Sequence, residues 1–476
     1  MNKFIGRKEE LASLEALYRR EGFQMVIIYG RRRTGKSTLI SEFVRNKNCI
    51  HFTATRSGIE KNIERLGKQV LEHFDDFPKG LEFKTAESVW ETIGQFAAKE
   101  RLVLVIDELP YLAEASDEFI SVLQYYIDSQ WMNTQLYLIL CGSSVSFMED
   151  EVLSEKSPIY GRRTSQIRLR PFDYLEAAEF VPDYSPEDKA LCYGITGGVA
   201  KYLSLIDDTK SIEENIILLF FSKTGFFYEE PGNLLNQEFR NVSLYSDILD
   251  AIASGVNRPN EIVDRTHYTD TVIAHALKTL QSTDIISRVC AITDESNKKK
   301  TIYCIDDGML RFWYRFIPDA IDSIEAGRGE SYFNHRVKSR ISEYMGEIFE
   351  RMCRSYTLKE GLDFHLNCMV SSVGKWWGTN PKTKKQTDID VVGLDKGKKQ
   401  AVLGECKYRN ELFDKTSFDE LLERNGLIDH KYEIVQYLLF SKGGFSDWLK
   451  SNADPEKIKL VDLKDMYYLK CNNKSE

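Results

Sequence analysis

The stretch "FQMVIIYGRRRTGKSTLISEFV" (residues 23–44) decides the fold of the N-terminal part of this sequence. It opens with an apolar run that is typical of a buried strand in a parallel sheet. The run ends at "GRRRTGKST" (30–38), which fits G-x-x-x-x-G-K-[ST], and a helical pattern begins at Ser37. A strand, a glycine-containing loop and a helix in this order predict a loop whose backbone N–H groups wrap phosphates at the helix N-terminus.

Each part of this loop has a predicted role. Lys36 is expected to reach the β- and γ-phosphates of a nucleotide, and the Ser37 hydroxyl to ligate Mg²⁺. Thr38 is placed near the α-phosphate. The predicted nucleotide-binding residues of the loop are Gly30, Arg33, Thr34, Gly35, Lys36, Ser37 and Thr38.

A second apolar run, "LVLVIDELPYL" (102–112), places two carboxylates at the end of a predicted strand. Asp107 is expected to hold the Mg²⁺ through water, and Glu108 to polarise the water that attacks the γ-phosphate. A strand ending in Asp-Glu about seventy residues after a phosphate-binding loop therefore predicts nucleotide hydrolysis in addition to binding.

The third apolar run, "TQLYLILCGSS" (134–144), ends in small polar residues. Ser143 or Ser144 would lie beside the γ-phosphate if this strand lies between the other two in the sheet, and Ser143 is then a candidate for orienting water. Alternatively, a serine after glycine is ordinary turn chemistry. Arg162 and Arg163 follow as candidates for stabilising transition-state charge, within the chain or across subunits, or else they form a surface pair.

These motifs, together with "FIGRKEEL" (4–11), "YGRR" (160–163) and "GGVAKYL" (197–203), stand in an order that resembles the AAA+/STAND-type ATPases of archaea and bacteria. The resemblance covers roughly residues 1–310 and implies ATP as the nucleotide. The absence of an NKxD guanine-reading motif agrees with ATP. Ala200 stands where the family usually has proline. The family's first element packs near the adenine, which places three further residues at the nucleotide: Phe4, Ile5 and Arg7.

Residues 241–305 show three helical patterns followed by a hairpin, which is the layout of a winged helix. In a DNA-binding module the helix "TDTVIAHALKTL" (269–280) would enter the major groove. The alternative, that the module only packs as an extension of a helical lid, is favoured because the exposed positions of this helix are poor in positive charge. Those positions are Thr269, Thr271, His275 and Lys278.

Near the C-terminus, "TDIDVVGLDKGKKQAVLGECKYRNEL" (387–412) predicts two strands joined by a turn at 396–399. This register sets Asp390 opposite Glu405, at a Cβ separation of ~4.5–5.5 Å, so the two carboxylates would repel unless a cation lies between them. Oxygen ligands favour Mg²⁺ or Mn²⁺. Lys407 could then orient or deprotonate water, or stabilise the charge of the pentavalent phosphate.

Side chains alternate between the two sides of a strand, so the charged residues of this hairpin share one side. Asp388 falls opposite Lys407, and the alternative to a metal site is a solvent-facing hairpin with a weak Asp388–Lys407 salt bridge. The opposite side is predicted to face the core, and it carries Ile389, Val391, Val402 and Cys406.

"GEIFE" (346–350), "DIDVVG" (388–393) and "GECKY" (404–408) resemble the pattern of the PD-(D/E)xK nuclease superfamily. The literal proline-aspartate is missing here. The resemblance implies a metal-dependent nuclease-like domain in which the metal is held by Asp390 and Glu405. The implied catalytic residues are Asp390, Glu405 and Lys407, with Glu350 as the carboxylate from the helix.

Composition sets the context for these motifs. The chain has 476 residues, enough for about two to four domains. Its nine cysteines contain no CxxC pair, which argues against zinc fingers and disulfide frameworks, and no apolar run is long enough to cross a membrane. A cytoplasmic location is therefore expected. The net charge of −9 argues against an indiscriminate polyanion binder, although local basic patches remain at Lys298–Lys300 and at Lys382, Lys384 and Lys385.

The predicted fold class is α/β, with a P-loop NTPase core at 1–170, a helical lid at 171–235, a winged helix at 236–325 and a restriction-endonuclease-like domain at 326–476. The predicted function is ATP hydrolysis that controls a Mg²⁺-dependent nuclease-like domain acting on nucleic acid, with DNA favoured over RNA. A molecular switch that binds a protein partner is the alternative, and a winged-helix transcription factor is the weakest reading. Oligomeric state stays open.

Overall fold

The computed structural model describes residues 4–74, 77, 81–83, 85–294, 301–381, 383–428 and 432–468. The basic candidates at Lys298–Lys300 and Lys382 lie outside these residues. The chain divides into two compact units. The first, here called the N-terminal unit, joins Met1–Phe172 to the short stretch Val199–Tyr202, and the second joins Asp173–Gly198 to Leu203–Glu476.

The N-terminal unit is built on a five-stranded sheet with the order β2-β3-β4-β1-β5, in which every neighbouring pair is parallel. The three strands at its centre are buried along their whole length, as expected for a parallel sheet with helices on both faces. The strands are β1 (Gln24–Tyr29), β2 (Cys49–Thr53), β3 (Leu102–Asp107), β4 (Leu136–Gly142) and β5 (Ser165–Arg168).

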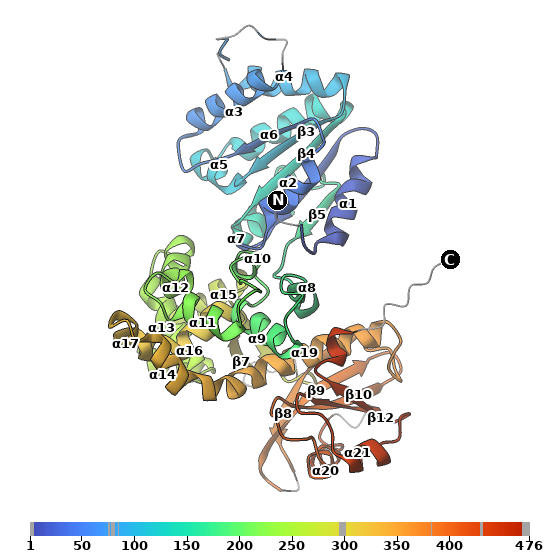
Figure 1. Cartoon of the computed structure of the whole chain (residues 1–476). Helices are drawn as coiled ribbons and strands as arrows, with labels where there is room; N and C mark the ends of the chain where they lie inside the picture. Colours follow the sequence, from blue (N-terminus) through green and yellow to red (C-terminus); the bar gives the residue numbers. More distant parts are fainter. Residues whose placement is uncertain are drawn as a thin grey trace. The chain divides into compact units, whose positions relative to one another are not determined.

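Helices cover both faces of this sheet (Figure 1). One face packs against α1 (Lys8–Tyr18) and α2 (Lys36–Val44), which bury leucine, isoleucine and phenylalanine side chains on it. The other face carries the larger apolar cluster. Its helices are α3 (Ile59–His73), α4 (Ala86–Lys99), α5 (Leu109–Ala115) and α6 (Phe119–Ser129), and the short α7 (Val145–Phe147) follows β4.

The second unit begins with helices. The first group is α8 (Tyr174–Ala178), α9 (Pro186–Thr196), α10 (Ala200–Leu203), which starts within the N-terminal unit's stretch, α11 (Ile212–Phe220) and α12 (Phe226–Glu238). The next group is α13 (Val242–Ala253), α14 (Pro259–Thr266) and α15 (Asp270–Ser282), followed by the antiparallel pair β6 (Ile286–Cys290) and β7 (Thr301–Ile305). Three helices followed by two strands match the order predicted from residues 241–305, while a winged-helix role stays a prediction. Next come α16 (Gly308–Phe316), α17 (Ile321–Glu325) and α18 (Gly329–Tyr332).

The C-terminal part of the second unit is a five-stranded mixed sheet with the order β12-β11-β10-β9-β8. Figure 1 shows α19 (Ile341–Leu362) along one face of this sheet, with α20 (Lys415–Glu423) and α21 (Asp447–Asn452) on the other. The Tyr344 hydroxyl on α19 donates to Gly194 O on α9 at 2.9 Å, which ties the first helices of this unit to its last domain. The strands are β8 (Ser372–Thr379), β9 (Gln386–Asp395), β10 (Gln400–Lys407), β11 (Glu433–Ser441) and β12 (Ile458–Asp462).

The β9–β10 hairpin has the predicted turn and register, since Gln400 pairs with Asp395 and Gly404 with Val391. The side predicted to face the core does so, since Ile389, Val391 and Val402 are fully buried and Cys406 is partly buried. The alternative of a solvent-facing hairpin was wrong. Val392 and Leu403, on the side that carries the charged residues, are as buried as Val391 on the other side. The hairpin is central in the sheet and helices cover both its faces, so only the charged end remains polar on that side.

None of the helices in the described part of the chain is both long and apolar enough to cross a membrane.

Candidate functional site

The phosphate-binding loop leaves β1 and enters α2 with an unusual backbone. Gly30, Arg33 and Gly35 have φ angles of 153°, 70° and 92°, a region that disfavours most side chains. The Lys36 ammonium is buried and donates to Gly30 O at 2.7 Å and Arg31 O at 2.9 Å. Burial lowers the pKa of Lys36 from its ordinary value. Its ammonium therefore lies inside the loop, where it can exchange carbonyl partners for phosphate oxygens.

The two carboxylates at the end of β3 lie beside this loop. The Ser37 hydroxyl donates to Asp107 Oδ2 at 3.4 Å, and the Glu108 N–H donates to Asp107 Oδ1 at 2.9 Å. Burial acts to raise the pKa of Asp107, but hydrogen bonds from His51, Cys141 and the Glu108 N–H outweigh it and leave that pKa below its ordinary value. Asp107 is therefore an anionic carboxylate close to the Ser37 hydroxyl.

Ser143 meets the condition on which its predicted role depended. Its strand, β4, lies between β1 and β3, so the ends of the three strands converge at one edge of the sheet. The Ser143 hydroxyl lies 2.9 Å from Oε1 and 2.8 Å from Oε2 of Glu108, and the Ser143 N–H donates to Oε2 at 3.4 Å. The serine thus holds the carboxylate that was predicted to polarise water.

Among the residues of the first motif, Arg7 contacts the loop from outside. The Arg7 guanidinium donates to Thr34 O at 3.2 Å and lies 4.1 Å from the centroid of the Phe172 ring. Phe4 is partly buried and packs on the apolar cluster under α1 and α2, next to Ile5 in the chain. Arg7 therefore supports the loop from behind, while Thr38 is exposed on α2.

Arg162 does not reach the loop in this structure. Its Nε and Nη2 each donate at 2.7 Å to a different oxygen of Asp128 on α6, and its Nη1 donates to Pro158 O at 2.9 Å. A bidentate pair of this kind holds a guanidinium in a set orientation. The catalytic role of Arg162 stays a prediction, because in this structure its guanidinium is paired with Asp128 on α6.

Sequence reasoning missed three contacts near the loop. His51 Nε2, on β2, lies 4.0 Å from Asp107 Oδ2. Arg33 donates from Nη1 to the Tyr202 hydroxyl at 3.2 Å, and the Lys201 N–H donates to Arg33 O at 3.1 Å. His51, a polar residue within the short strand β2, was a sequence signal for the contact with Asp107. No local pattern predicts that Arg33 contacts Tyr202.

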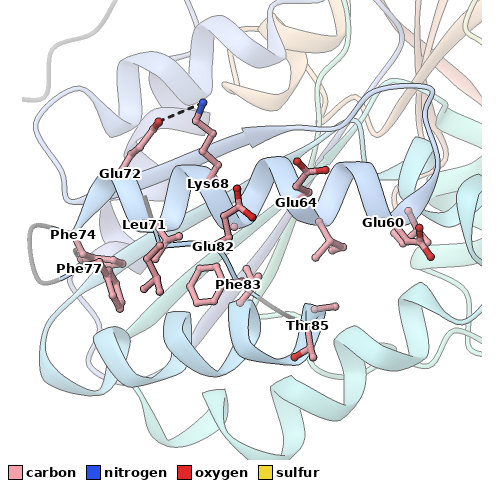
Figure 2. Close-up of a pocket in the computed structure, with 16 residues that line it drawn as sticks. Glu60, Glu64, Lys68, Leu71, Glu72, Phe74, Phe77, Glu82, Phe83 and Thr85 are labelled. Carbon is pink, nitrogen blue, oxygen red and sulfur yellow. Dashed lines mark ion pairs between the residues drawn. The ribbon is translucent and has the colours of Figure 1, made fainter. Parts of the chain in front are cut away.

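The N-terminal unit also has a groove that is separate from the loop. Figure 2 shows it between α3 and α4. Its volume is about 1070 Å³. Aromatic side chains line it, and the ion pair between Lys68 and Glu72, 3.8 Å apart, lies at its edge. None of its described lining residues belongs to the phosphate-binding loop or to the ends of β3 and β4, so the groove does not bear on the nucleotide site.

In the second unit, four carboxylates gather at the charged end of the β9–β10 hairpin. We call Glu350, Asp388, Asp390 and Glu405 the acidic cluster. Asp390 Oδ2 accepts the Cys406 N–H at 3.0 Å, across the hairpin. Burial and the charge of Glu405 raise the pKa of Asp390, and burial and the charge of Asp390 raise the pKa of Glu350. The predicted carboxylates are therefore neighbours, and they oppose each other's ionisation.

Basic side chains lie among these carboxylates. Glu405 accepts from Lys407 Nζ at 2.6 Å and from Arg424 Nη1 at 2.7 Å, so each of its oxygens has a cationic donor. Lys375 on β8, which no sequence motif had identified, contacts the other three members of the cluster. Glu343 and Glu347, on the same helix as Glu350, pair with Arg315 and Arg351.

This arrangement does not fit a divalent metal as it stands. No three Asp, Glu, His or Cys side chains are grouped as a metal site among the residues that the structure describes. At the acidic cluster the reason is visible, because ammonium and guanidinium groups take the carboxylate oxygens that a metal would need. The metal-binding role of Asp390 and Glu405 therefore stays a prediction.

Comparison with known proteins agrees with the two-part organisation. Residues 4–206 match a family model described as an ATPase domain predominantly from Archaea, and residues 313–420 match one described as archaeal and bacterial proteins of unknown function. An uncharacterized protein of Methanocaldococcus jannaschii is 28% identical over 415 residues, which are 86% of this chain and 88% of that protein. An uncharacterized ATP-binding protein of the same organism is 21% identical over 309 residues, 55% of this chain and 82% of that one.

Among solved structures, a Walker-type ATPase of Pyrococcus abyssi matches with a TM-score of 0.50 and 21% identity, covering 66% of this chain and 96% of that one. At this identity the match speaks for the fold alone. Together with the family model, it shows that the N-terminal part of this chain is an α/β P-loop ATPase domain. The match over 313–420 describes no activity, and it leaves the nuclease-like character of the last domain as a proposal.

Proposed function

We propose that this protein binds and hydrolyses ATP in its N-terminal unit, and that this cycle controls a nuclease-like C-terminal domain that acts on DNA. The observation that carries the ATPase proposal is the convergence of five side chains at one edge of the parallel sheet. They are Lys36, Ser37, Asp107, Glu108 and Ser143.

The residues beside the loop fit Mg²⁺, because a hydroxyl oxygen and an anionic carboxylate oxygen lie 3.4 Å apart at Ser37 and Asp107. A bound Mg²⁺ would neutralise charge on the β- and γ-phosphates. Lys36 would bind the same phosphates from within the loop. Glu108 would take a proton from the attacking water, while Ser143 keeps the carboxylate oriented.

The test separates nucleotide binding from hydrolysis. Lys36→Ala should lose ATP binding, measured with a fluorescent ATP analogue. Glu108→Gln should bind ATP like the wild type but hydrolyse it about 10²–10⁴-fold more slowly, because general-base catalysis contributes this much. Glu64→Gln, an exposed glutamate on α3, is the matched control and should behave as wild type. Undiminished hydrolysis by Glu108→Gln would refute the assignment of Glu108.

The nuclease-like role rests on a separate observation. The β9–β10 register brings Asp390, Glu405 and Lys407 to one end of the hairpin, and α19 adds Glu350 to the same cluster. Carboxylates from a helix and two adjacent strands, with a lysine beside them, are the groups that phosphodiester hydrolysis uses. Among the residues of the second unit that the structure describes, no other feature favours a chemical function as specifically.

Cleavage is tested with plasmid and single-stranded DNA and RNA in Mg²⁺ or Mn²⁺, with and without ATP. We expect cleavage by the wild type, no cleavage by Asp390→Ala, and altered ATP dependence in Lys36→Ala. If the wild type cuts nothing under any condition, or if Asp390→Ala cuts as well as wild type, the C-terminal domain is a binding module instead. The protein would then be an ATP-dependent switch for a protein partner.

A further inference from the structure

Lys375 lies at the centre of the acidic cluster. Its Nζ is 2.9 Å from Asp388 Oδ2, 3.1 Å from Glu350 Oε2 and 3.7 Å from Asp390 Oδ1. These three carboxylates come from β9 and α19, so a single ammonium joins a helix to two neighbouring strands. The Lys375 side chain is 22% exposed, so the cluster does not enclose it completely.

The backbone of β8 fixes the position of the Lys375 Cα atom. The β8–β9 pairing shifts register between Gly374 and Trp376, on either side of Lys375. The Ile292 N–H also donates to Lys375 O at 3.0 Å, which anchors the strand at this residue. The Cα position of Lys375 is therefore set by the sheet, while its four-carbon side chain can change rotamer.

The carboxylates do not depend equally on this lysine. Glu405 has Lys407 and Arg424, and Glu350 also accepts from Arg354 Nη1 at 3.3 Å. For Asp388 and Asp390, Lys375 is the one ion-pair partner among the described residues. Removing its ammonium would leave two neighbouring aspartates with uncompensated charge.

A divalent cation and this ammonium cannot share the same oxygens. Mg²⁺ needs oxygen ligands at about 2.0–2.1 Å in near-octahedral geometry, whereas the ammonium already lies within hydrogen-bonding distance of oxygens from two carboxylates. Two cations within a few ångströms of each other would also repel. At Glu350, Asp388 and Asp390 the misfit with a metal therefore comes from the flexible side chain of Lys375, while both oxygens of Glu405 are taken by Lys407 and Arg424.

We propose that Lys375 is a resident counter-ion of the acidic cluster, and that its ammonium keeps a divalent cation away from Glu350, Asp388 and Asp390. This inference rests on the proposed nuclease-like function of the same cluster. The lysine keeps the cluster folded and charge-balanced without metal, and it weakens the affinity for the metal.

The experiment measures metal binding and does not depend on catalysis. Full-length, nucleotide-free protein is titrated with Mn²⁺, and electron paramagnetic resonance reports the Mn²⁺ that remains in solution. Asp390→Asn serves as the blank for Mn²⁺ bound at other sites. Lys375→Met should bind Mn²⁺ at least about tenfold more tightly than wild type, because a repelling cation has been removed. Lys359→Met, an exposed lysine on α19, should leave the affinity unchanged.

A second readout checks the counter-ion role directly. Without metal, Lys375→Met should unfold at a lower temperature than wild type, and Mn²⁺ should restore more of that loss than it adds to wild type. Lys375→Gln, which keeps a polar side chain, provides the same comparison if the methionine variant does not fold. Unchanged or weaker Mn²⁺ affinity in both variants would overturn the proposal, as would a lack of Mn²⁺ binding in every protein.

These outcomes separate the inference from the nuclease proposal. If Lys375→Met tightens Mn²⁺ binding but neither protein cuts nucleic acid, the counter-ion role stands and the nuclease proposal fails. If the wild type cuts and Lys375→Met shows no gain in affinity, the nuclease proposal stands and the counter-ion role fails.

Discussion

At the scale of single residues, the contact between Ser143 and Glu108 joins the ends of two adjacent strands. Both carboxylate oxygens of Glu108 lie within 3 Å of the serine hydroxyl, and Glu108 itself begins α5 in a left-handed conformation with φ of 55°. A non-glycine residue holds such a conformation only where its surroundings support it. Ser143 therefore orients a side chain whose backbone is already constrained.

Ser143→Ala should lower the turnover of ATP without weakening ATP binding. A hydrogen bond to a charged group contributes about 1.5–3 kcal/mol, so kcat should fall about 10- to 100-fold while KM changes little. Steady-state hydrolysis measurements test this, and Ser144→Ala is the neighbouring control. An equal loss in both variants would mean that the serines act through local structure and not through Glu108.

Gly30 should tolerate no side chain. Its φ is 153°, and a Cβ there would lie 2.2 Å from Leu169 O, the carbonyl that follows β5. Gly30→Ala should therefore destabilise the N-terminal unit by about 1–3 kcal/mol, seen as a lower thermal midpoint. Gly232→Ala, inside α12 with open space around it, should stabilise by about 0.5–1 kcal/mol. Equal midpoints for the two variants would contradict the steric argument.

The residues that the sequence identified and those it missed differ in one physical respect. Asp107 and Glu108 lie at the end of β3, and Lys36 begins the helix that follows β1. The local sequence pattern alone places all three at one edge of the sheet. Lys375 and Tyr202 act through contacts with residues distant in the chain, and no spacing in one segment can predict such a contact. The chemistry of the cluster was therefore predicted without its central cation.

At the scale of elements, α19 carries Glu350 of the acidic cluster near its middle and contacts the edge strand of the sheet near its C-terminus. Near its C-terminus, Glu360 accepts from Lys459 Nζ of β12 at 2.6 Å and lies 3.3 Å from His365 Nδ1. Burial acts to raise the pKa of Glu360, but Lys459 and His365 outweigh it and lower that pKa from its ordinary value of 4.5. This ion pair joins the long helix to the last strand of the sheet.

The Glu360–Lys459 pair should make the stability of the C-terminal domain depend on pH. A carboxyl whose folded pKa is depressed stabilises fully above its unfolded pKa, and that contribution is lost as the pH falls through the folded pKa. Glu360→Gln should thus cost about 1.5–3 kcal/mol near neutral pH and progressively less below about pH 4.5. Thermal unfolding across this range, with hydrogen exchange of β12, measures it.

The exposed Glu456, just before β12, provides the control for this measurement. Glu456→Gln should leave stability unchanged at every pH. A destabilisation by Glu360→Gln that stays constant down to pH 4 would show that the side chain acts by packing and not by charge.

Elements were predictable where their pattern is local. The turn at 396–399 set the register of β9 and β10 because a short loop allows few pairings. β8 was not predicted as a neighbour of β9, and without it the hairpin appeared to have a polar side. The burial of Val392 and Leu403 depends on strands and helices elsewhere in the chain, which is why the alternative of a solvent-facing hairpin failed although the predicted core side is buried.

At the scale of the whole molecule, the compact units do not follow the order of the sequence. Val199–Tyr202 belongs to the N-terminal unit, although residues on both sides of it belong to the other. Within the N-terminal unit, a Cβ on Gly35 would lie 3.3 Å from the Ala200 Cβ, so the stretch passes close to the phosphate-binding loop. Lys201 and Tyr202 of this stretch hydrogen-bond to Arg33, so the loop has partners that lie beyond the first 172 residues of the chain.

A fragment ending at residue 172 should therefore bind ATP more weakly than the full chain, although it contains the whole parallel sheet. In the full chain, Tyr202→Phe removes one hydrogen bond to Arg33 and should weaken ATP binding about 2- to 10-fold. Titration with a fluorescent ATP analogue compares the three proteins. Wild-type affinity in both the fragment and the variant would show that the stretch has no part in nucleotide binding.

Because the two units interleave along the chain, they also limit which recombinant genes can encode a working protein. An exchange of gene segments at residue 172 would bring a new second unit together with its own four residues against the phosphate-binding loop. Those residues would have been selected for the loop of a different protein. Recombination at this boundary should therefore yield working chimaeras only between close relatives, so the two halves of the gene are expected to share one ancestry.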